Sequence, residues 1–550
     1  MPLLFLLVGL LCSCTFSFVS GSSSEKTTSS DKTSTEASLS SGIASVGTTP
    51  SDGAAVLLTS TNDGSQYGAP KKAAGVSGTN YVSKSNAIPE KTMDEASGTI
   101  CLTPEGAQKI LVIPVIIDDY ATNATSANRE RIYRTFFGNP SDTSWESLSS
   151  YYYKSSFGKL LLQGSVSDWY DCGYTASGLA ALTSSDTSYD PTWTVLRGAV
   201  AWYKGTYHTD ATEFDNDGDG HIDGVWLVYS APDIQSDSSL SKSLFWAYTY
   251  WDVREKASTS SPSACVYCWG SYDFMNIGYG ESGTDAHTFC HETGHMLGLE
   301  DYYVSAKISG TKNYGPMGLI DMMDGNIIDH NAYSKFALDW IDPLVVSGAT
   351  TLTLKPSSTS GQAVLIPADN SWNGSAFDEY MLLEYYTPDL LNLSDSENTY
   401  PNRYPAFREN GVRIYHVDER LAKAMVSGSS VSYSYTDALV HNSSSYTIRA
   451  HSNSNGYNVL DENFRAIQAI DCTLKRNFDT ECASSGVRYH ADNSTLFQAG
   501  DTFSYVTYQN SFPNYYYDSV STMNDGKTFP YKVVFSAMTS EGITLTVSAA

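Results

Sequence analysis

The stretch KILVIPVIIDDY (109–120) is a short, nearly continuous run of apolar and β-branched residues. A run of this kind predicts a strand that is buried on both faces of a sheet. Helical patterns follow at 127–137, 142–157 and 192–205, and a second apolar run, GVWLVYSA, occupies 224–231. Because strands alternate with helices, we expect this part of the chain to form layers of helix around a mixed sheet.

The pattern changes beyond Pro343, where short alternating runs replace the helical patterns. Such runs predict a mostly antiparallel, β-rich domain over 346–550. We therefore expect an α+β protein with two folded units, one at 106–345 and this C-terminal domain. The alternating runs are TTLTL (350–354), AVLIP (363–367), YMLLEYY (380–386), GVRIYHV (411–417) and YKVVFSA (531–537).

The first 20 residues form an apolar stretch followed by small polar residues, which we interpret as an export signal. Because the segment Leu11-Cys12-Ser13-Cys14 is close to a bacterial lipoprotein box, one hypothesis is that Cys14 is lipidated and anchors the chain to a membrane. Plain cleavage near Ser20 and a retained anchor are the alternatives. All three place the protein at the cell surface or in the extracellular space. Residues 21–105 are expected to be a Ser/Thr-rich, disordered tether that includes a propeptide or more linker.

The chain carries 60 Asp and Glu residues against 33 Lys and Arg residues, a formal net charge of −27. This balance argues against nucleic acid as the main partner, since nucleic acid binding needs clustered Lys and Arg to displace counterions. It fits an exported protein that self-repulsion keeps soluble, or one that attracts cationic substrates.

The cysteines suggest disulfides rather than a structural metal site. In an oxidising compartment some should pair, and Cys472 with Cys482 is the most plausible local bridge. Cys265 and Cys268 have the CxxC spacing, but no second pair accompanies them at finger spacing, so a structural zinc site is not expected there.

The segment HETGHMLGLED (291–301) carries the HExxH pattern. On a helix, this spacing places His291 and His295 on one face, one turn apart, so both can bind one zinc ion. Gly298 is expected to end the helix and turn the chain, so that Asp301 can supply the third ligand, with Glu300 as a competing carboxylate. Three protein ligands leave the fourth position of a catalytic zinc for water.

Glu292 follows the first ligand but is rotated off its face of the helix. It is therefore expected to be the general base, which takes a proton from water and later delivers it to the leaving amine. His287 lies one turn before His291 and is expected behind the site or at the surface.

A second acidic set lies in the segment DNDGDGHID. Asp215, Asp217, Asp219 and Asp223 are spaced like the first half of a calcium loop, with glycine at the sixth position. The Glu usual at the twelfth position is replaced by Trp226. The sequence leaves two interpretations, bound calcium or an Asx- and Gly-rich turn that leads into a strand.

The pattern HExxHxxGxxD with a downstream Met is metzincin-like, and the chain resembles the immune inhibitor A family of secreted bacterial metallopeptidases. The similar segments run in the same order: ILVIPVIIDD (110–119), SYYYKSSFGKLLLQGSVSDWY (150–170), DNDGDGHIDGVWLVY (215–229), the zinc motif, GLIDMMDG (318–325), AYSKFALDW (332–340), EYMLLEYY (379–386) and GVRIYHVDE (411–419).

The resemblance implies a zinc peptidase in which Met323 is the Met-turn residue beneath the zinc ligands, with Met322 as the alternative. His416 and Asp418 stand at a family-like position, where packing is the expected role. The chain departs from the family pattern in the Thr-Gly pair inside HETGH and in Asp339, where such chains often have Gly.

Hydrolysis of proteins or peptides by a zinc endopeptidase is therefore the predicted function. The substrate is expected to add as a strand beside a sheet edge next to the cleft, formed by the segment 263–276. One alternative is a catalytically silent surface binding protein or adhesin that keeps the fold, although such a protein has no need of Glu292. Another is a zinc hydrolase with a different substrate, since the metal site alone does not define the substrate.

Overall fold

The structure is a computed structural model that describes residues 55–73, 81–82, 102–182, 190–252, 255–304, 315–368, 372–442, 444–453, 459–461, 463–476, 478, 490–511 and 522–550. The predicted export signal with Cys14 lies outside these residues, as does Cys482. Within them, no helix has the length and apolar composition needed to cross a bilayer.

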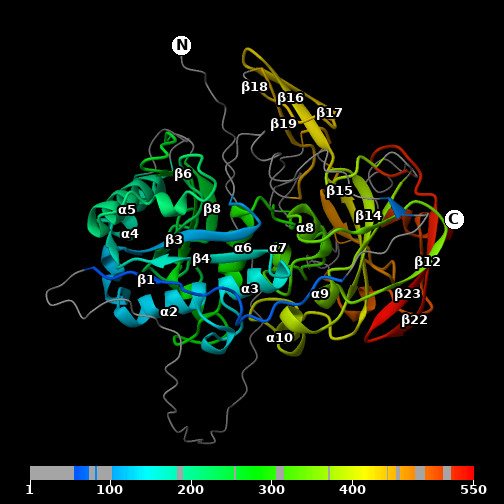
Figure 1. Ribbon diagram of the computed structural model, residues 1–550, viewed down its shortest axis with the longest axis horizontal. Helices are drawn as coiled ribbons and strands as arrows, with labels where there is room; N and C mark the ends of the chain where they lie inside the picture. Colours follow the sequence, from blue (N-terminus) through cyan, green and yellow to red (C-terminus); the bar gives the residue numbers. More distant parts are fainter. Residues whose placement is uncertain are drawn as a thin grey trace, which may run out of the picture.

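A mixed sheet of seven strands forms the N-terminal half of the molecule (Figure 1). Its order is β1 (Leu58–Thr59), β4 (Leu160–Val166), β3 (Gly106–Ile116), β7 (Val225–Tyr229), β10 (Val266–Ser271) and β8 (Tyr248–Trp251), with β5 (Tyr170–Asp171) paired to the end of β3. The strands from β4 to β10 are parallel, whereas β1 and β8 are antiparallel to their neighbours. The two apolar runs of the sequence thus form central strands, as predicted.

Helices cover both faces of this sheet, which explains the continuous apolar character of β3. Ile110 and Val112 share one apolar cluster with α2 (Ser126–Phe137), α3 (Leu148–Ser155) and α6 (His287–Met296). The alternate residues Leu111 and Ile113 share a second cluster with α4 (Ala176–Ala180) and α5 (Thr192–Tyr207). The side chains of a strand alternate between the faces, so both faces must be apolar.

The C-terminal half contains the mostly antiparallel sheets that the alternating runs predicted, with β11 (Leu344–Val346) and β13 (Val364–Pro367) as a parallel pair. A six-stranded sheet has the order β2 (Tyr81–Val82), β11 (Leu344–Val346), β13 (Val364–Pro367), β14 (Glu379–Tyr386), β15 (Gly411–Asp418) and β20 (Ile467–Ala469). A four-stranded sheet has the order β12 (Thr350–Leu354), β23 (Gly542–Ala549), β22 (Tyr531–Thr539) and β21 (Thr502–Ser504). Another four-stranded sheet has the order β17 (Ser430–Thr436), β16 (Leu421–Ser427), β19 (Ser445–Arg449) and β18 (His441–Asn442).

Short elements complete the fold. They are β6 (His221–Ile222) paired with β9 (Ser263–Ala264), the helices α7 (Met322–Gly325), α8 (Ala332–Ala337), α9 (Ser357–Ser360), α10 (Leu393–Glu397) and α11 (Tyr505–Tyr508), and the 3₁₀ turns η1 (Asp118–Asn123), η2 (Pro140–Asp142), η3 (Thr212–Phe214), η4 (Tyr272–Asn276), η5 (Leu390–Asn392), η6 (Asn493–Thr495) and η7 (Gln509–Ser511). The helical pattern at 142–157 is realised only as α3, which begins at Leu148 after a capping box on Ser147.

One apolar cluster joins the two predicted domains. It contains Phe289 of α6 and Trp340 together with Leu382 of β14 and Tyr415 of β15. The predicted boundary at 345/346 falls inside β11. The β-rich half therefore packs directly against the half that carries the HExxH helix.

Part of the predicted tether is folded. β1 pairs with β4 and β2 with β11, and Tyr67 is buried against Tyr153. The expectation of disorder throughout 21–105 is thus wrong for the described residues of that range, because strand pairing and aromatic packing hold them on the two sheets.

Candidate metal centre

Helix α6 carries both histidines of the HExxH pattern in the apolar layer beneath the mixed sheet. It ends at Met296, and Gly298 has a φ of 92°, a left-handed conformation that glycine adopts without strain. The chain turns there as predicted and brings Asp301 back to the helix. Three atoms converge there, a ring nitrogen of His291, a ring nitrogen of His295 and a carboxylate oxygen of Asp301. All three atoms lie within 4.8 Å of one another, and all three residues are buried.

The hydrogen bonds of the two rings define their tautomers. Nδ1 of His291 lies 2.8 Å from the carbonyl oxygen of Met322, and Nδ1 of His295 lies 2.8 Å from that of Leu299. Because a carbonyl only accepts, each Nδ1 carries the proton and each neutral ring presents the lone pair of Nε2. The Nε2 atoms of His291 and His295 lie 3.1 and 3.3 Å from Oδ1 of Asp301.

This donor set fits a divalent metal ion. Two nitrogen lone pairs and a carboxylate oxygen at these separations repel one another unless a positive charge lies among them. Nε2 of His295 is buried and makes no hydrogen bond within the described part of the chain. Two imidazoles and one carboxylate, with the outer ring nitrogens bonded to carbonyl groups, are typical ligands of catalytic zinc.

The pKa values of the cluster reflect the mutual attraction of the Asp301 carboxylate and the two imidazole rings. Burial lowers the pKa of His295, but the charge of Asp301 outweighs burial and the net shift is upward. Burial raises the pKa of Asp301, but the positive charge that His295 and His291 carry when protonated holds it well below its usual range. Asp301 therefore stays ionised at any ordinary pH.

The structure brings Asp301, and not Glu300, to the histidines. The carboxylate of Glu300 instead lies 4.0 Å from Arg449 of β19. Arg449 also donates to the carbonyl oxygen of Gly298 at 2.9 Å, and Asn453 donates to that of Tyr302 at 2.9 Å. The β-rich half thus holds the loop that carries Asp301.

Glu292 lies beside the ligands but not among them. Thr249, on β8, donates from Oγ1 to the main-chain carbonyl of Glu292 at 2.7 Å. The same Oγ1 lies 3.3 Å from Oε2 of the Glu292 side chain. Burial raises the pKa of Glu292 above its ordinary value, although the charges of His291 and His295 oppose this shift. A carboxyl group with a raised pKa accepts and returns a proton more readily near neutral pH.

Both methionines of the DMMDG segment contact α6, in different ways. Met322 supplies the carbonyl that binds His291, whereas the side chain of Met323 packs under Gly294. A Cβ atom at Gly294 would lie only 2.7 Å from Sδ of Met323, so the Gly inside HETGH makes room for this contact. The main-chain N–H of Tyr302 donates to the carbonyl of Met323 at 2.8 Å, which ties the turn to the ligand loop.

Buried charges from the six-stranded sheet support the same turn. Arg413 of β15 donates to the carbonyl of Ile320 at 2.8 Å and pairs with Glu384 of β14 at 3.4 Å. Glu384 also accepts from the main-chain N–H of Ala332 at 3.1 Å. Burial raises the pKa of Asp321, which caps α7, to about 6, although Arg413 opposes this shift.

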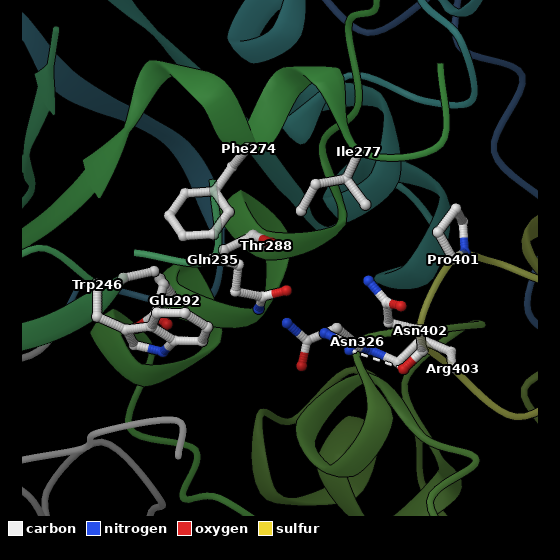
Figure 2. A pocket seen from close by; sticks show the side chains of 11 residues that line it. Gln235, Trp246, Phe274, Ile277, Thr288, Glu292, Asn326, Pro401, Asn402 and Arg403 are labelled. Atoms are coloured by element: carbon white, nitrogen blue, oxygen red, sulfur yellow. Dashed lines mark hydrogen bonds between the residues drawn. The ribbon is translucent and has the colours of Figure 1, made fainter. Parts of the chain in front are cut away.

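A shallow pocket, partly open to solvent, adjoins Glu292 (Figure 2). Thr288 and Glu292 of α6 form one wall, and the turn from Pro401 to Arg403 lies opposite. The remaining lining residues are Gln235, Trp246, Ala247, Phe274, Ile277 and Asn326. A concave site beside a buried carboxyl group is the usual setting for substrate.

The strand predicted to receive substrate is an interior one. β10, within 263–276, pairs with β7 on one side and β8 on the other, so its backbone groups are already bonded. The expectation that this segment forms the edge is therefore wrong. β8 is the last strand at this end of the described sheet, and it carries Thr249 next to Glu292.

Three of the four acidic residues in the DNDGDGHID segment converge. Carboxylate oxygens of Asp215, Asp217 and Asp223 lie within 4.8 Å of one another, whereas Asp219 caps its own turn by accepting from the N–H of His221. Asp223 is buried, and its Oδ1 has no hydrogen-bond partner among the described residues. Burial, with a smaller contribution from the charge of Asp217, raises the pKa of Asp223 to about 7.

His287 is neither at the surface nor directed at the metal ligands. It is fully buried between Trp145 and Tyr400, with Nδ1 2.7 Å from Asp285 and Nε2 3.3 Å from Asp395. Burial lowers its pKa, but the two carboxylates outweigh burial and raise it to about 9. Of the two positions expected for His287, behind the site or at the surface, the surface one is wrong, because aromatic rings and carboxylates enclose the side chain.

The other singled-out residues lie away from the centre. Nε2 of His416 lies 2.7 Å from Glu379, and Asp418 accepts two hydrogen bonds from Arg420, in a buried network within the β-rich half. The cysteines that the structure describes are free thiols: Cys172, Cys265, Cys268, Cys290 and Cys472. Disulfides were expected among the cysteines, and none forms within this set.

Sequence reasoning did not find Thr249, Asp395, Arg403 or Arg449. Each comes from a segment far along the chain from α6, and no motif surrounds it. Sequence reasoning also missed Asp285, but here a local signal exists, because Asp285 precedes His287 by only two residues.

Comparison of the chain with protein-family models and with curated proteins finds no match. The structure itself shows a mixed α/β protein with one mixed, largely parallel sheet and several antiparallel sheets. It also shows a buried group of two histidines and an aspartate that could hold a metal ion.

Proposed function

We propose that the protein is an exported zinc-dependent endopeptidase, similar in its catalytic site to the immune inhibitor A family. One observation carries the proposal. The Nε2 lone pairs of His291 and His295 converge with Asp301 on one point, directly beside a buried Glu292 that faces a pocket. A silent binding protein gains nothing from a buried carboxyl group in this position.

Each residue has a role in hydrolysis of a peptide bond. His291, His295 and Asp301 hold zinc, which supplies a Lewis acid that activates water and polarises a carbonyl group. Glu292 accepts a proton from the water and delivers it to the leaving amine. Met322 and Leu299 hold the two rings in the tautomer that presents Nε2.

Among the described residues β8 is the last strand at its end of the sheet, and it is the best place for an extended substrate. Trp246 and Ala247 lead from the pocket into this strand, and Thr249 on the strand touches Glu292. A peptide that adds to β8 would run past the general base with its backbone groups paired.

A second, structural cation fits the DNDGDGHID segment. Asp215, Asp217 and Asp223 supply converging oxygen atoms, and calcium prefers such ligands. The unpartnered Oδ1 of buried Asp223 supports bound calcium over a simple turn. Asp219 would take part only through water or not at all.

The test separates metal binding from chemistry. Glu292→Ala should keep nearly normal zinc content while cleavage of a diverse peptide mixture falls by at least about a hundredfold. His295→Ala and Asp301→Ala should lose zinc and activity together, because two protein ligands hold the ion poorly. Glu300→Ala is the matched control, and it should keep its zinc.

Two results would count against the proposal. Full peptidase activity in Glu292→Ala would falsify the assigned base. A zinc-loaded wild-type protein that cuts no peptide or protein would favour the silent surface binding protein instead.

A further inference from the structure

The pocket beside Glu292 has a mixed chemical character. Trp246, Phe274 and Ile277 give it an apolar side, which suits the methylene groups of a side chain (Figure 2). Gln235, Asn326 and Asn402 contribute carboxamide groups, and Arg403 is the basic residue among the described residues of the lining.

Arg403 is held in place on the wall opposite Glu292. Its guanidinium lies 6.0 Å from the ring centroid of Tyr400 and donates to the carbonyl of Asn402 at 3.2 Å. Tyr400 is fixed in turn, because its hydroxyl donates to Asp285 at 2.5 Å. A guanidinium that is held by an aromatic ring offers planar donors at low entropic cost.

Asn326 adds an acceptor to the same space. It lies just after α7 in a left-handed conformation, with φ 54°, and only 4% of its surface is exposed. Its Oδ1 is buried and accepts no hydrogen bond from any residue that the structure describes. Figure 2 shows its amide between Gln235 and Arg403. An unsatisfied buried oxygen is costly unless a ligand pairs with it.

We infer that this pocket binds the side chain of a residue flanking the scissile bond, and that it selects a planar carboxamide or carboxylate at the end of an aliphatic stem, as in Gln or Glu. The inference rests on the proposed peptidase function. Arg403 donates to the oxygen of such a group, Asn326 accepts from a carboxamide N–H, and the apolar wall covers the stem.

The test uses four peptides that differ only at one position flanking the cut, with Gln, Glu, Met or Lys there. These side chains have similar length, so differences report on the terminal group. The wild-type, zinc-loaded, full-length protein should cut the Gln and Glu peptides with a kcat/KM at least about tenfold higher than the Met and Lys peptides. Both flanking positions are varied in separate series.

Two variants locate the selectivity. Arg403→Glu should lower the ratio of kcat/KM for the Glu peptide to that for the Lys peptide by at least about tenfold. Arg403→Leu should lower kcat/KM for the Gln and Glu peptides toward the value for the Met peptide. Lys532→Glu is the control, because Lys532 is an exposed residue of β22 and its substitution alters the net charge as much as Arg403→Glu does. It should leave the ratios of kcat/KM between the four peptides unchanged. Zinc content and melting temperature are measured for each variant.

The outcomes are distinguishable. If the wild type cuts no peptide, the proposed function and this inference both fail. If it cuts the four peptides equally, prefers Met, or keeps its Gln and Glu preference in both Arg403 variants, the pocket does not select as stated, while the peptidase function stands.

Discussion

The contact between Gly294 and Met323 gives the sharpest test of how the metal centre is built. Gly294→Ala adds one methyl group in the middle of α6, between the two histidines. That methyl would lie 2.7 Å from Sδ of Met323, 3.1 Å from its Cε and 3.4 Å from the hydroxyl of Tyr152. Both Met323 and Tyr152 are fully buried, so neither can move freely.

Two opposing effects determine the stability change. Ala is favoured over Gly in a helix by about 1 kcal/mol. Forcing a methyl group into a packed core costs about 1–3 kcal/mol. We therefore expect Gly294→Ala to lower the free energy of unfolding by about 0–2 kcal/mol, and to weaken zinc binding because Met323 moves relative to the ligands.

A matched substitution isolates the clash. Gly205 lies in α5, and a Cβ atom added to it would meet no atom of the described residues within 4 Å, so Gly205→Ala should stabilise the protein by about 0.5–1 kcal/mol. The unfolding free energy is measured by urea titration, and zinc affinity by competition with a chelator. In a Met323→Ala background, the penalty of Gly294→Ala should disappear. If Gly294→Ala stabilises as much as Gly205→Ala and binds zinc normally, Met323 does not pack against the helix.

Two further predictions concern pH and calcium. The pKa of His287 is raised to about 9, so its ion pairs should stabilise the fold fully below about pH 6.5 and be lost as pH rises through about 9. Urea titrations at several pH values should show a loss on the order of 3 kcal/mol that is missing in His287→Gln; an equal loss in that variant would rule out this triad as the source. Asp223 has a raised pKa of about 7, so its ionisation should destabilise the calcium-free protein increasingly between about pH 4 and 7. Asp223→Asn should then raise the calcium-free melting temperature at pH 7.5 and abolish the stabilisation by calcium, and a calcium response that persists would return the loop to a simple turn.

Much of the fold could be predicted from the chain because it depends on local patterns. The apolar run at 109–120 predicted a strand buried on both faces, and the alternating runs after 346 predicted mostly antiparallel strands, although β14 and β15 are buried along their whole length. What local patterns could not show was that the two halves share one core, because Phe289 and Tyr415 are 126 residues apart and meet only after folding. The order of the strands could not be predicted for the same reason, and β8 rather than β10 is the last strand at that end of the described sheet.

The candidate metal centre was likewise determined partly by local sequence and partly by tertiary structure. The sequence by itself determined that His291 and His295 share one face, since the α-helical repeat sets that geometry whatever surrounds it. It also indicated the turn at Gly298. Only the tertiary structure decided that Asp301 rather than Glu300 reaches the rings, because Arg449 from a distant strand holds that loop.

The surroundings of the site were decided almost wholly by the tertiary structure. Asp395 reaches His287 across 108 residues, and Arg403 enters the pocket from a turn that no motif marks. Hydrogen bonds and ion pairs act over a few ångströms in space and carry no regular spacing along the chain. The sequence therefore determined which chemistry the centre offers, and the packing of distant segments decided what holds it and what it faces.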